Sequence, residues 1–148
     1  MKYLLDASAL LPLVTRRGKQ LIIEASREDL FTTDLALYEA CNSTWKLATL
    51  LKSITLEDAV DISTTIKDLV TRNVIQLEEF AKLNISNTLK RACEERLTFY
   101  EASYITNAES NGAILVTEDE KLRKAARKFV ESITYTDFEN RLASNPPA

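Results

Sequence analysis

The chain has 148 residues, of which 45% are hydrophobic and 28% charged, and its formal net charge is −3. These values predict one globular domain and argue against a strongly basic nucleic-acid-binding protein, although a local basic patch is compatible with them. The sequence contains no histidine, which excludes Ser-His-Asp triads, Cys-His pairs, His-ligated zinc sites and RNA hydrolysis by paired histidines. Any hydrolysis must therefore use carboxylates, lysine or a metal-bound water.

The N-terminal stretch predicts a buried strand followed by a helix. Tyr3, Leu4 and Leu5 show no polar alternation, which is typical of a strand buried on both faces of a parallel sheet. Asp6 comes where this strand ends and a short helix containing Pro12 begins. A carboxylate at that position is either a helix N-cap or part of a site.

The next part of the chain predicts a second helix, a second strand and a long third helix. The helix is expected at about 19–28, the strand at 30–32, and the long helix from a cap at Thr33 or Asp34 to about residue 52. The residues of the long helix expected to face the core are Leu37, Cys41, Thr44, Ala48 and Leu51. On another face of that helix, at i, i+3 and i+7, lie Glu39, Asn42 and Lys46.

The second half continues the alternation of helices and strands. Thr98 and Glu101 have the spacing of a capping box, with Leu97 and Ala102 placed as a hydrophobic staple, and Thr117 and Glu120 repeat the capping-box spacing. The expected elements are a helix at 56–72, a strand at 74–77, a helix at 80–93, a helix at 98–111, a strand at 113–116, a strand at 132–135 and a helix opened by Thr136 and Glu139.

This alternation predicts an α/β fold with a parallel sheet, formed by a single domain over residues 1–143 and followed by a disordered tail at 144–148. No apolar run is long enough to span a bilayer, and Asp6 interrupts any signal-peptide core, so we expect a cytoplasmic protein with no membrane partner. Cys41 and Cys93 are expected to be buried small hydrophobes in a reducing compartment.

Four carboxylates, Asp6, Glu39, Glu101 and Asp119, occur at or near the starts of predicted helices. Helices that leave a parallel sheet start at its carboxyl edge, so Asp6, Glu39 and Asp119 should gather there, and Glu101 could join them. Taken singly, Glu101 and Asp119 are explained well by helix capping. Taken together, crowded carboxylates without His or Cys select Mg²⁺ or Mn²⁺, ions that support attack on a phosphodiester.

The chain resembles the PIN-domain nucleases, and among them most closely the VapC-type toxins of toxin–antitoxin pairs, in four segments: residues 4–10 (LLDASAL), 38–42 (YEACN), 97–104 (LTFYEASY) and 115–122 (LVTEDEKL). The resemblance implies a three-layer α/β/α fold with a central parallel five-stranded sheet of order 3-2-1-4-5. It also implies a Mg²⁺- or Mn²⁺-dependent endoribonuclease. The metal-binding catalytic carboxylates would be Asp6, Glu39, Glu101 and Asp119, with Ser8 and Thr117 ordering the site and Asn42 supporting Glu39.

The chain departs from the family at Glu101, where the family usually has aspartate. The extra methylene moves the carboxylate by roughly 1.5 Å, one carbon–carbon bond. Because Mg²⁺ demands near-ideal octahedral geometry, the departure bears on whether one or two metals bind. It also leaves open a weakly active or inactive PIN domain that acts as an RNA-binding or complex-forming module.

The resemblance further implies RNA as substrate, a homodimer, and a cognate antitoxin protein that places a basic side chain in the acidic pocket. Lys46 and Lys121 are the candidates for phosphate contact, because each shares a helix with one of the four acids. A receiver-like phosphotransfer domain ranks last. It would need an acceptor aspartate after a central strand and a lysine after a late one, but Glu78 and Glu79 follow residues 74–77, and no lysine follows 132–135.

Overall fold

The computed structural model describes residues 1–17, 20, 23 and 27–144. The elements in chain order are β1 (Lys2–Leu5), α1 (Ala7–Arg17), β2 (Asp29–Thr33), α3 (Asp34–Thr49), α4 (Leu56–Thr71), β3 (Gln76–Glu78), the 3₁₀-helix η1 (Phe80–Lys82), α5 (Ile85–Glu95), α6 (Phe99–Asn111), β4 (Ile114–Val116), α7 (Glu120–Ala126), β5 (Ser132–Ile133) and α8 (Tyr135–Ser144). Most of the predicted helix at 19–28, and the predicted disordered tail beyond Ser144, lie outside the described residues.

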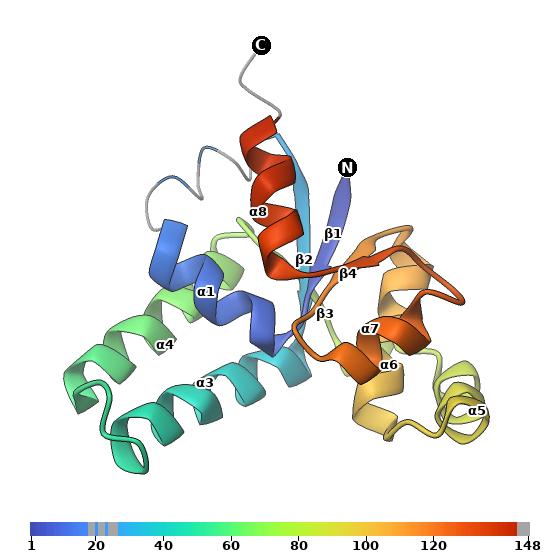
Figure 1. The fold of residues 1–148 in the computed structure, drawn as a ribbon, viewed down its shortest axis with the longest axis horizontal. Coiled ribbons are helices and arrows are strands. Elements are labelled where there is room, and N and C mark those ends of the chain that lie inside the picture. The colour runs from blue at the N-terminus through green and yellow to red at the C-terminus, as the bar shows by residue number, and fades with distance from the viewer. Residues whose placement is uncertain (18–19, 21–22, 24–26, 145–148) are drawn as a thin grey trace.

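The five strands form one parallel sheet in the order β3-β2-β1-β4-β5 (Figure 1). The expected parallel sheet and strand order are confirmed. β1 is the central strand: Tyr3 pairs with Leu30 on one side and with Ile114 on the other. Leu4 and Leu5 have no exposed surface, which agrees with their uninterrupted apolar pattern. The residue that follows β1 therefore lies at the middle of the carboxyl edge.

Helices pack on both sides of this sheet. Figure 1 shows α1, α3 and α4 on one side and α5 and α6 on the other, which gives the expected three layers. α8 closes the far end of the core, where the ring of Phe138 lies edge-on to Tyr3 with centroids 4.9 Å apart. No helix in the described ranges combines the length and apolar character needed to cross a bilayer.

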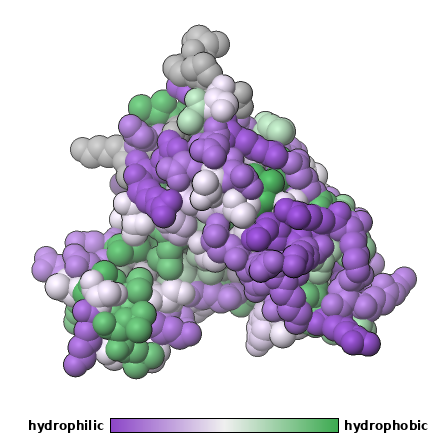
Figure 2. Space-filling view, in the orientation of Figure 1, coloured by the Kyte–Doolittle hydropathy of each residue, from purple (hydrophilic) through white to green (hydrophobic). Residues whose placement is uncertain are grey.

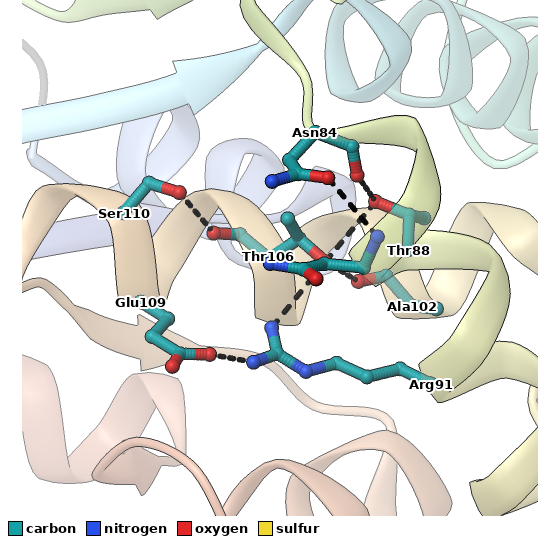
Figure 3. A network of polar contacts seen from close by, with 8 residues as sticks. Asn84, Thr88, Arg91, Ala102, Thr106, Glu109 and Ser110 are labelled. Carbon is teal, nitrogen blue, oxygen red and sulfur yellow. Dashed lines mark hydrogen bonds and ion pairs between the residues drawn. The ribbon is translucent and has the colours of Figure 1, made fainter.

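A polar network fastens α5 to α6 (Figure 3). Thr88 Oγ1 donates a 3.1 Å hydrogen bond to Thr106 Oγ1, and a guanidinium nitrogen of Arg91 donates to the same oxygen at 3.4 Å. The other branch of the guanidinium forms an ion pair with Glu109. Since α6 carries Glu101, this network fixes the helix that presents one of the four acids.

The buried face of α3 differs from the predicted stripe. Its buried residues are Ala36, Ala40 and Thr44. Thr44 is buried as predicted, but Ala36 and Ala40 each lie one position before the predicted Leu37 and Cys41. α3 packs mainly against α4 and α1, and its small residues face the core while Leu37 is only partly buried against it. Cys41 is consequently exposed, and so is Cys93 on α5, so the prediction of two buried cysteines was wrong.

Three helix starts were also misplaced. The helix predicted at 80–93 is divided into η1 and α5, because Asn84 is extended and caps α5 by accepting from Asn87 N. α7 is capped by Asp119, two residues after the predicted Thr117. α8 starts at Tyr135 rather than at Thr136, which leaves β5 only two residues long.

Candidate active site

One open pocket of about 500 Å³ at the carboxyl edge of the sheet contains all four candidate carboxylates. Asp6 lines it from the end of β1, Glu39 from α3, Glu101 from α6, and Asp119 from the start of α7. The other lining residues are Leu35, Thr98, Tyr100, Tyr104 and Leu122. Residues up to 113 positions apart in the sequence thus meet in one concave site.

Asp6 is the most enclosed of the four, with only 5% of its surface exposed. Its Oδ1 accepts from Ser8 Oγ at 2.6 Å and from the backbone N–H of Ala9 at 3.1 Å, and its Oδ2 accepts a hydrogen bond from Thr117 Oγ1. Both oxygens are therefore held by donors on two different elements, α1 and the turn after β4. The carboxylate has a fixed orientation at the floor of the pocket.

Ser8 and Thr117 connect Asp6 to the turn that carries Asp119. Ser8 Oγ accepts from Glu118 N at 2.9 Å, and Thr117 Oγ1 accepts from Asp119 N at 3.1 Å. Each hydroxyl thus donates to the Asp6 carboxylate and accepts from the turn between β4 and α7. This arrangement couples the positions of the two aspartates.

The protein environment raises the pKa of Asp6 from 3.8 to about 6. Burial is the main cause, because it penalises the charged carboxylate, and the nearby charge of Glu39 adds to it. The hydrogen bonds from Ser8, Thr117 and Ala9 act in the opposite direction. The net effect is a carboxylate that a nearby positive charge would stabilise strongly.

Glu39 is joined to α6 rather than to Asn42. Its Oε1 accepts a 2.9 Å hydrogen bond from the hydroxyl of Tyr104, which is 4% exposed. Burial, followed by the charge of Glu39, raises the pKa of Tyr104 above its ordinary value, so this phenol stays a donor. Asn42 is exposed on α3, and no hydrogen bond connects it to Glu39 in the described part of the chain.

Glu101 and Asp119 both cap helices while they line the pocket. Glu101 Oε2 accepts from Thr98 N at 2.9 Å, which completes the predicted capping box, and Asp119 Oδ1 accepts from Leu122 N at 3.0 Å. Capping and pocket lining are thus compatible at these positions.

The two candidate lysines differ in their distance from the acids. Lys121 Nζ lies 4.0 Å from Glu101 Oε2, at the rim of the pocket. Lys46 is exposed on α3, two helical turns beyond Glu39, and does not line the pocket. Direct contact of Lys46 with a phosphate at the acids is therefore less supported than contact of Lys121.

Comparisons with known proteins decide the family. Exonuclease VapC9 of Pyrobaculum aerophilum is 38% identical over 125 residues, covering 82% of this chain and 84% of that protein. Ribonuclease VapC3 of the same organism is 30% identical over 138 residues, covering 90% of this chain and 99% of that protein. The chain belongs to the VapC family of PIN-domain nucleases. No protein-family model matches it.

Solved structures share the fold of this chain. PAE2754 from P. aerophilum matches with a TM-score of 0.76 and 32% identity, covering 98% of this chain and all of that one. Two more distant structures show the same fold. VapBC-1 of nontypeable Haemophilus influenzae matches with a TM-score of 0.61 and 16% identity, covering 92% of this chain and 99% of that one. The PilT N-terminus domain protein SSO1118 of Sulfolobus solfataricus matches with a TM-score of 0.55 and 17% identity, covering 100% of this chain and 98% of that one.

The donor set of this VapC pocket fits a divalent cation by chemistry, since all four charged side chains that line it are carboxylates, the ligands that Mg²⁺ and Mn²⁺ prefer. As the side chains are placed, however, no three acidic or cysteine side chains among the described residues are close enough to hold an ion together. One oxygen of each of the three carboxylates other than Asp6 is already engaged: Glu39 Oε1 by Tyr104, and an oxygen of Glu101 and of Asp119 by a helix cap. Ion binding would bring the carboxylates closer together, and Glu39 can turn its Oε2 to an ion while its Oε1 keeps the bond to Tyr104.

Tyr104 is the site residue that the sequence reasoning missed. It lies three residues after Glu101 on α6, so both side chains point to the same face of the helix. This i+3 spacing was the available signal. It was hidden because an aromatic residue at helical spacing is more often part of the core than of a site.

Proposed function

We propose that this VapC protein is a divalent-metal-dependent endoribonuclease, the toxin of a toxin–antitoxin pair, with Mg²⁺ or Mn²⁺ as cofactor. The observation that carries the proposal is the meeting of Asp6, Glu39, Glu101 and Asp119 in one pocket at the carboxyl edge of the sheet. VapC relatives described as a ribonuclease and an exonuclease support nuclease chemistry. The metal and the mode of cleavage are the parts that need experiment.

The four carboxylates would hold the cation, which neutralises phosphate charge and lowers the pKa of a bound water. Asp6 contributes an oriented oxygen pair, because Ser8 and Thr117 fix it from both sides. Burial of the Asp6 side chain also weakens the screening of its carboxylate by water, which strengthens its attraction for a cation. At the rim of the pocket, Lys121 would contact the RNA backbone.

A protein partner suits the hydrophobic surface formed by the end of α3 and the start of α4, seen at the lower left of Figure 2. Its exposed side chains include Trp45, Leu51 and Leu56, with 49%, 69% and 76% of their surface exposed. An exposed cluster of this kind marks protein interaction sites. We propose a homodimer and a cognate antitoxin, both in the cytoplasm where the RNA is. Light scattering of the chain alone and with a candidate antitoxin tests both.

The first experiment is cleavage of a labelled structured-RNA pool, and of a circular RNA, by purified protein with Mn²⁺, Mg²⁺ or EDTA. We expect metal-dependent cleavage of both substrates, and its loss in Asp6→Asn. Opening of the circle identifies an endonuclease, since an exonuclease needs an end. Cleavage of linear RNA alone would contradict the endonuclease proposal, and cleavage in EDTA would contradict the metal.

The second candidate is a PIN domain that binds RNA or a partner without efficient cleavage. It is favoured by one observation, the use of Glu101 Oε2 as a helix cap in a place where the family usually has aspartate. Glu101→Gln separates the two, because glutamine preserves the capping box but removes the charge. We expect Mn²⁺ affinity, measured by calorimetry, to fall about tenfold in Glu101→Gln and to be kept in Glu101→Asp. Unchanged affinity in both would make Glu101 a cap only.

A further inference from the structure

We propose that a second pocket, next to the acidic one, binds a single unpaired nucleobase of the RNA beside the phosphodiester to be cut. The inference rests on the proposed nuclease function and adds a subsite that selects among RNA sequences. The second pocket is formed by other residues than the acids, since none of the four carboxylates lines it.

The second pocket encloses about 150 Å³ between the start of α3, η1 and the first turns of α6. Two residues, Leu35 and Tyr100, line both this pocket and the acidic one. The two sites are therefore neighbours, divided by these side chains. A nucleotide whose phosphate lies at the acids has its base within reach of the second pocket.

Two aromatic rings at the second pocket are left in contact with water. Phe80 is 60% exposed and Tyr100 is 62% exposed. Exposed aromatic faces beside a concave site are the usual platform for unstacked bases in single-stranded RNA.

The backbone of Phe80 is held in place by the side chain of Asp34. Asp34 Oδ2 accepts from Phe80 N at 2.8 Å, while Asp34 Oδ1 accepts from Leu35 N at 2.9 Å. Asp34 thus ties η1 to the start of α3, and the ring is presented from a defined place, which lowers the entropy cost of stacking on it.

Size, polarity and charge favour a base over the other parts of a nucleotide. The volume is several times the roughly 10–15 Å³ that one water needs on this measure, which leaves room for one flat ring system. Asn107, only 7% exposed, supplies an amide that can both donate to and accept from a base edge. The one charged residue among the described lining is Asp34, an anion that would repel a phosphate.

The experiment uses the full chain and single-stranded RNA in which 2-aminopurine replaces one base at a time, with Ca²⁺ in place of Mg²⁺ to slow cleavage. Stacking quenches this fluorophore, and anisotropy of the same RNA gives the affinity. We expect quenching at one position, and Phe80→Ala to abolish it and to weaken binding about tenfold, within the range for losing one base–aromatic stack. Tyr100→Phe should preserve the quenching, because the ring is kept.

The matched control is Tyr38→Ala, which removes a ring that is 81% exposed on α3 and does not line either site. An abasic nucleotide at the quenched position should bind wild type and Phe80→Ala equally. Quenching and affinity unchanged in Phe80→Ala, while the wild-type chain cleaves RNA with Mn²⁺, would overturn the base subsite alone. The base subsite would also be overturned if Phe80→Ala weakened the binding of a protein partner and left the binding of RNA unchanged. Absence of cleavage with any metal would instead count against the nuclease, and the binding measurements would still decide the subsite.

Discussion

The hydroxyl of Tyr104 donates a 2.9 Å hydrogen bond to Glu39 Oε1 and so connects α6 to α3 across the acidic pocket. The two residues are 65 positions apart in the sequence. Tyr104 is buried, while Glu39 is exposed at the open side of the pocket. A carboxylate held in this way has fewer orientations to lose when it binds a cation.

Replacement of Tyr104 by phenylalanine keeps the ring packing and removes only this donor. We expect Mn²⁺ affinity to fall about tenfold, the size of effect seen when a partner of a metal ligand is removed. Stability should fall by only about 1 kcal/mol, because exposed Glu39 can be rehydrated. Calorimetric titration measures the first effect and thermal unfolding the second, with exposed Tyr38→Phe as the control. Equal Mn²⁺ affinity in the two variants would contradict a positioning role.

The raised pKa of Asp6 predicts an unusual pH dependence in the metal-free protein. Its pKa is about 6 in the fold against 3.8 ordinarily, so between these values the folded state binds more protons than the unfolded state. Asp6 therefore stabilises the folded state fully below about pH 4, and this stabilisation is lost as the pH rises through 6. The difference of about two units corresponds to about 3 kcal/mol. Urea unfolding of the metal-free protein at several pH values measures it.

Asp6→Asn is the matched variant for this measurement, because the amide is nearly isosteric and does not titrate. We expect Asp6→Asn to lack this loss of stability between pH 4 and 6, so that at pH 7.5 it is more stable than the metal-free wild type. Excess Mn²⁺ should stabilise wild type but not Asp6→Asn, since a ligand stabilises only the state that binds it. Parallel stability curves for the two proteins would show that burial does not perturb Asp6.

Thr117 has no exposed surface and donates to the carboxylate of Asp6. Thr117→Val preserves shape and removes the hydroxyl, so we expect a loss of about 2 kcal/mol at pH 7, typical of a buried charged group that loses a hydrogen bond. The pKa of Asp6 should rise further, because a bond to its charged form is gone. Thr117→Ser, which keeps the donor, should restore most of both properties. NMR titration of the Asp6 carboxyl carbon, together with urea unfolding, checks them.

The central strands β1 and β4 were predictable because each carries a clear signal. Tyr3–Leu5 and Ile114–Val116 are uninterrupted apolar runs, and the structure buries all of them. The strand order came from the resemblance in the four motifs, not from the apolar pattern. Capping residues also gave a reliable local signal at Thr98 and Glu101, because the side-chain and backbone atoms involved are only three residues apart.

Features that depend on packing between distant elements were not predictable in the same way. Ala36 and Ala40, rather than Leu37, lie on the buried face of α3, because the side that this helix turns to the core is set by its packing against α4 and α1. The bond between Tyr104 and Glu39 depends on the relative rotation of two helices, which no local pattern reveals. The division of the helix at 80–93 depends partly on Asp34, which is 46 positions from Phe80 and fixes η1.

The last prediction concerns the support behind the acidic pocket. Arg91 is 11% exposed, pairs with Glu109, donates to Thr106, and lies over the ring of Phe129 with its guanidinium carbon 4.5 Å from the centroid. Arg91→Ala removes all three contacts, and we expect a loss of about 2 kcal/mol. In a chain of this size the Tm should fall by about 4–8 °C.

Lys90→Ala is the matched control for Arg91→Ala. Lys90 adjoins Arg91 on α5, is 73% exposed, and forms an exposed i,i+4 pair with Glu94, so its removal should change stability by less than about 0.5 kcal/mol. Because α6 also carries Glu101 and Tyr104, Arg91→Ala should weaken Mn²⁺ binding as well, although Arg91 does not line the pocket. Equal Tm values in the Lys90 and Arg91 variants would show that the network does not hold α6, and the metal affinity should then be unchanged too.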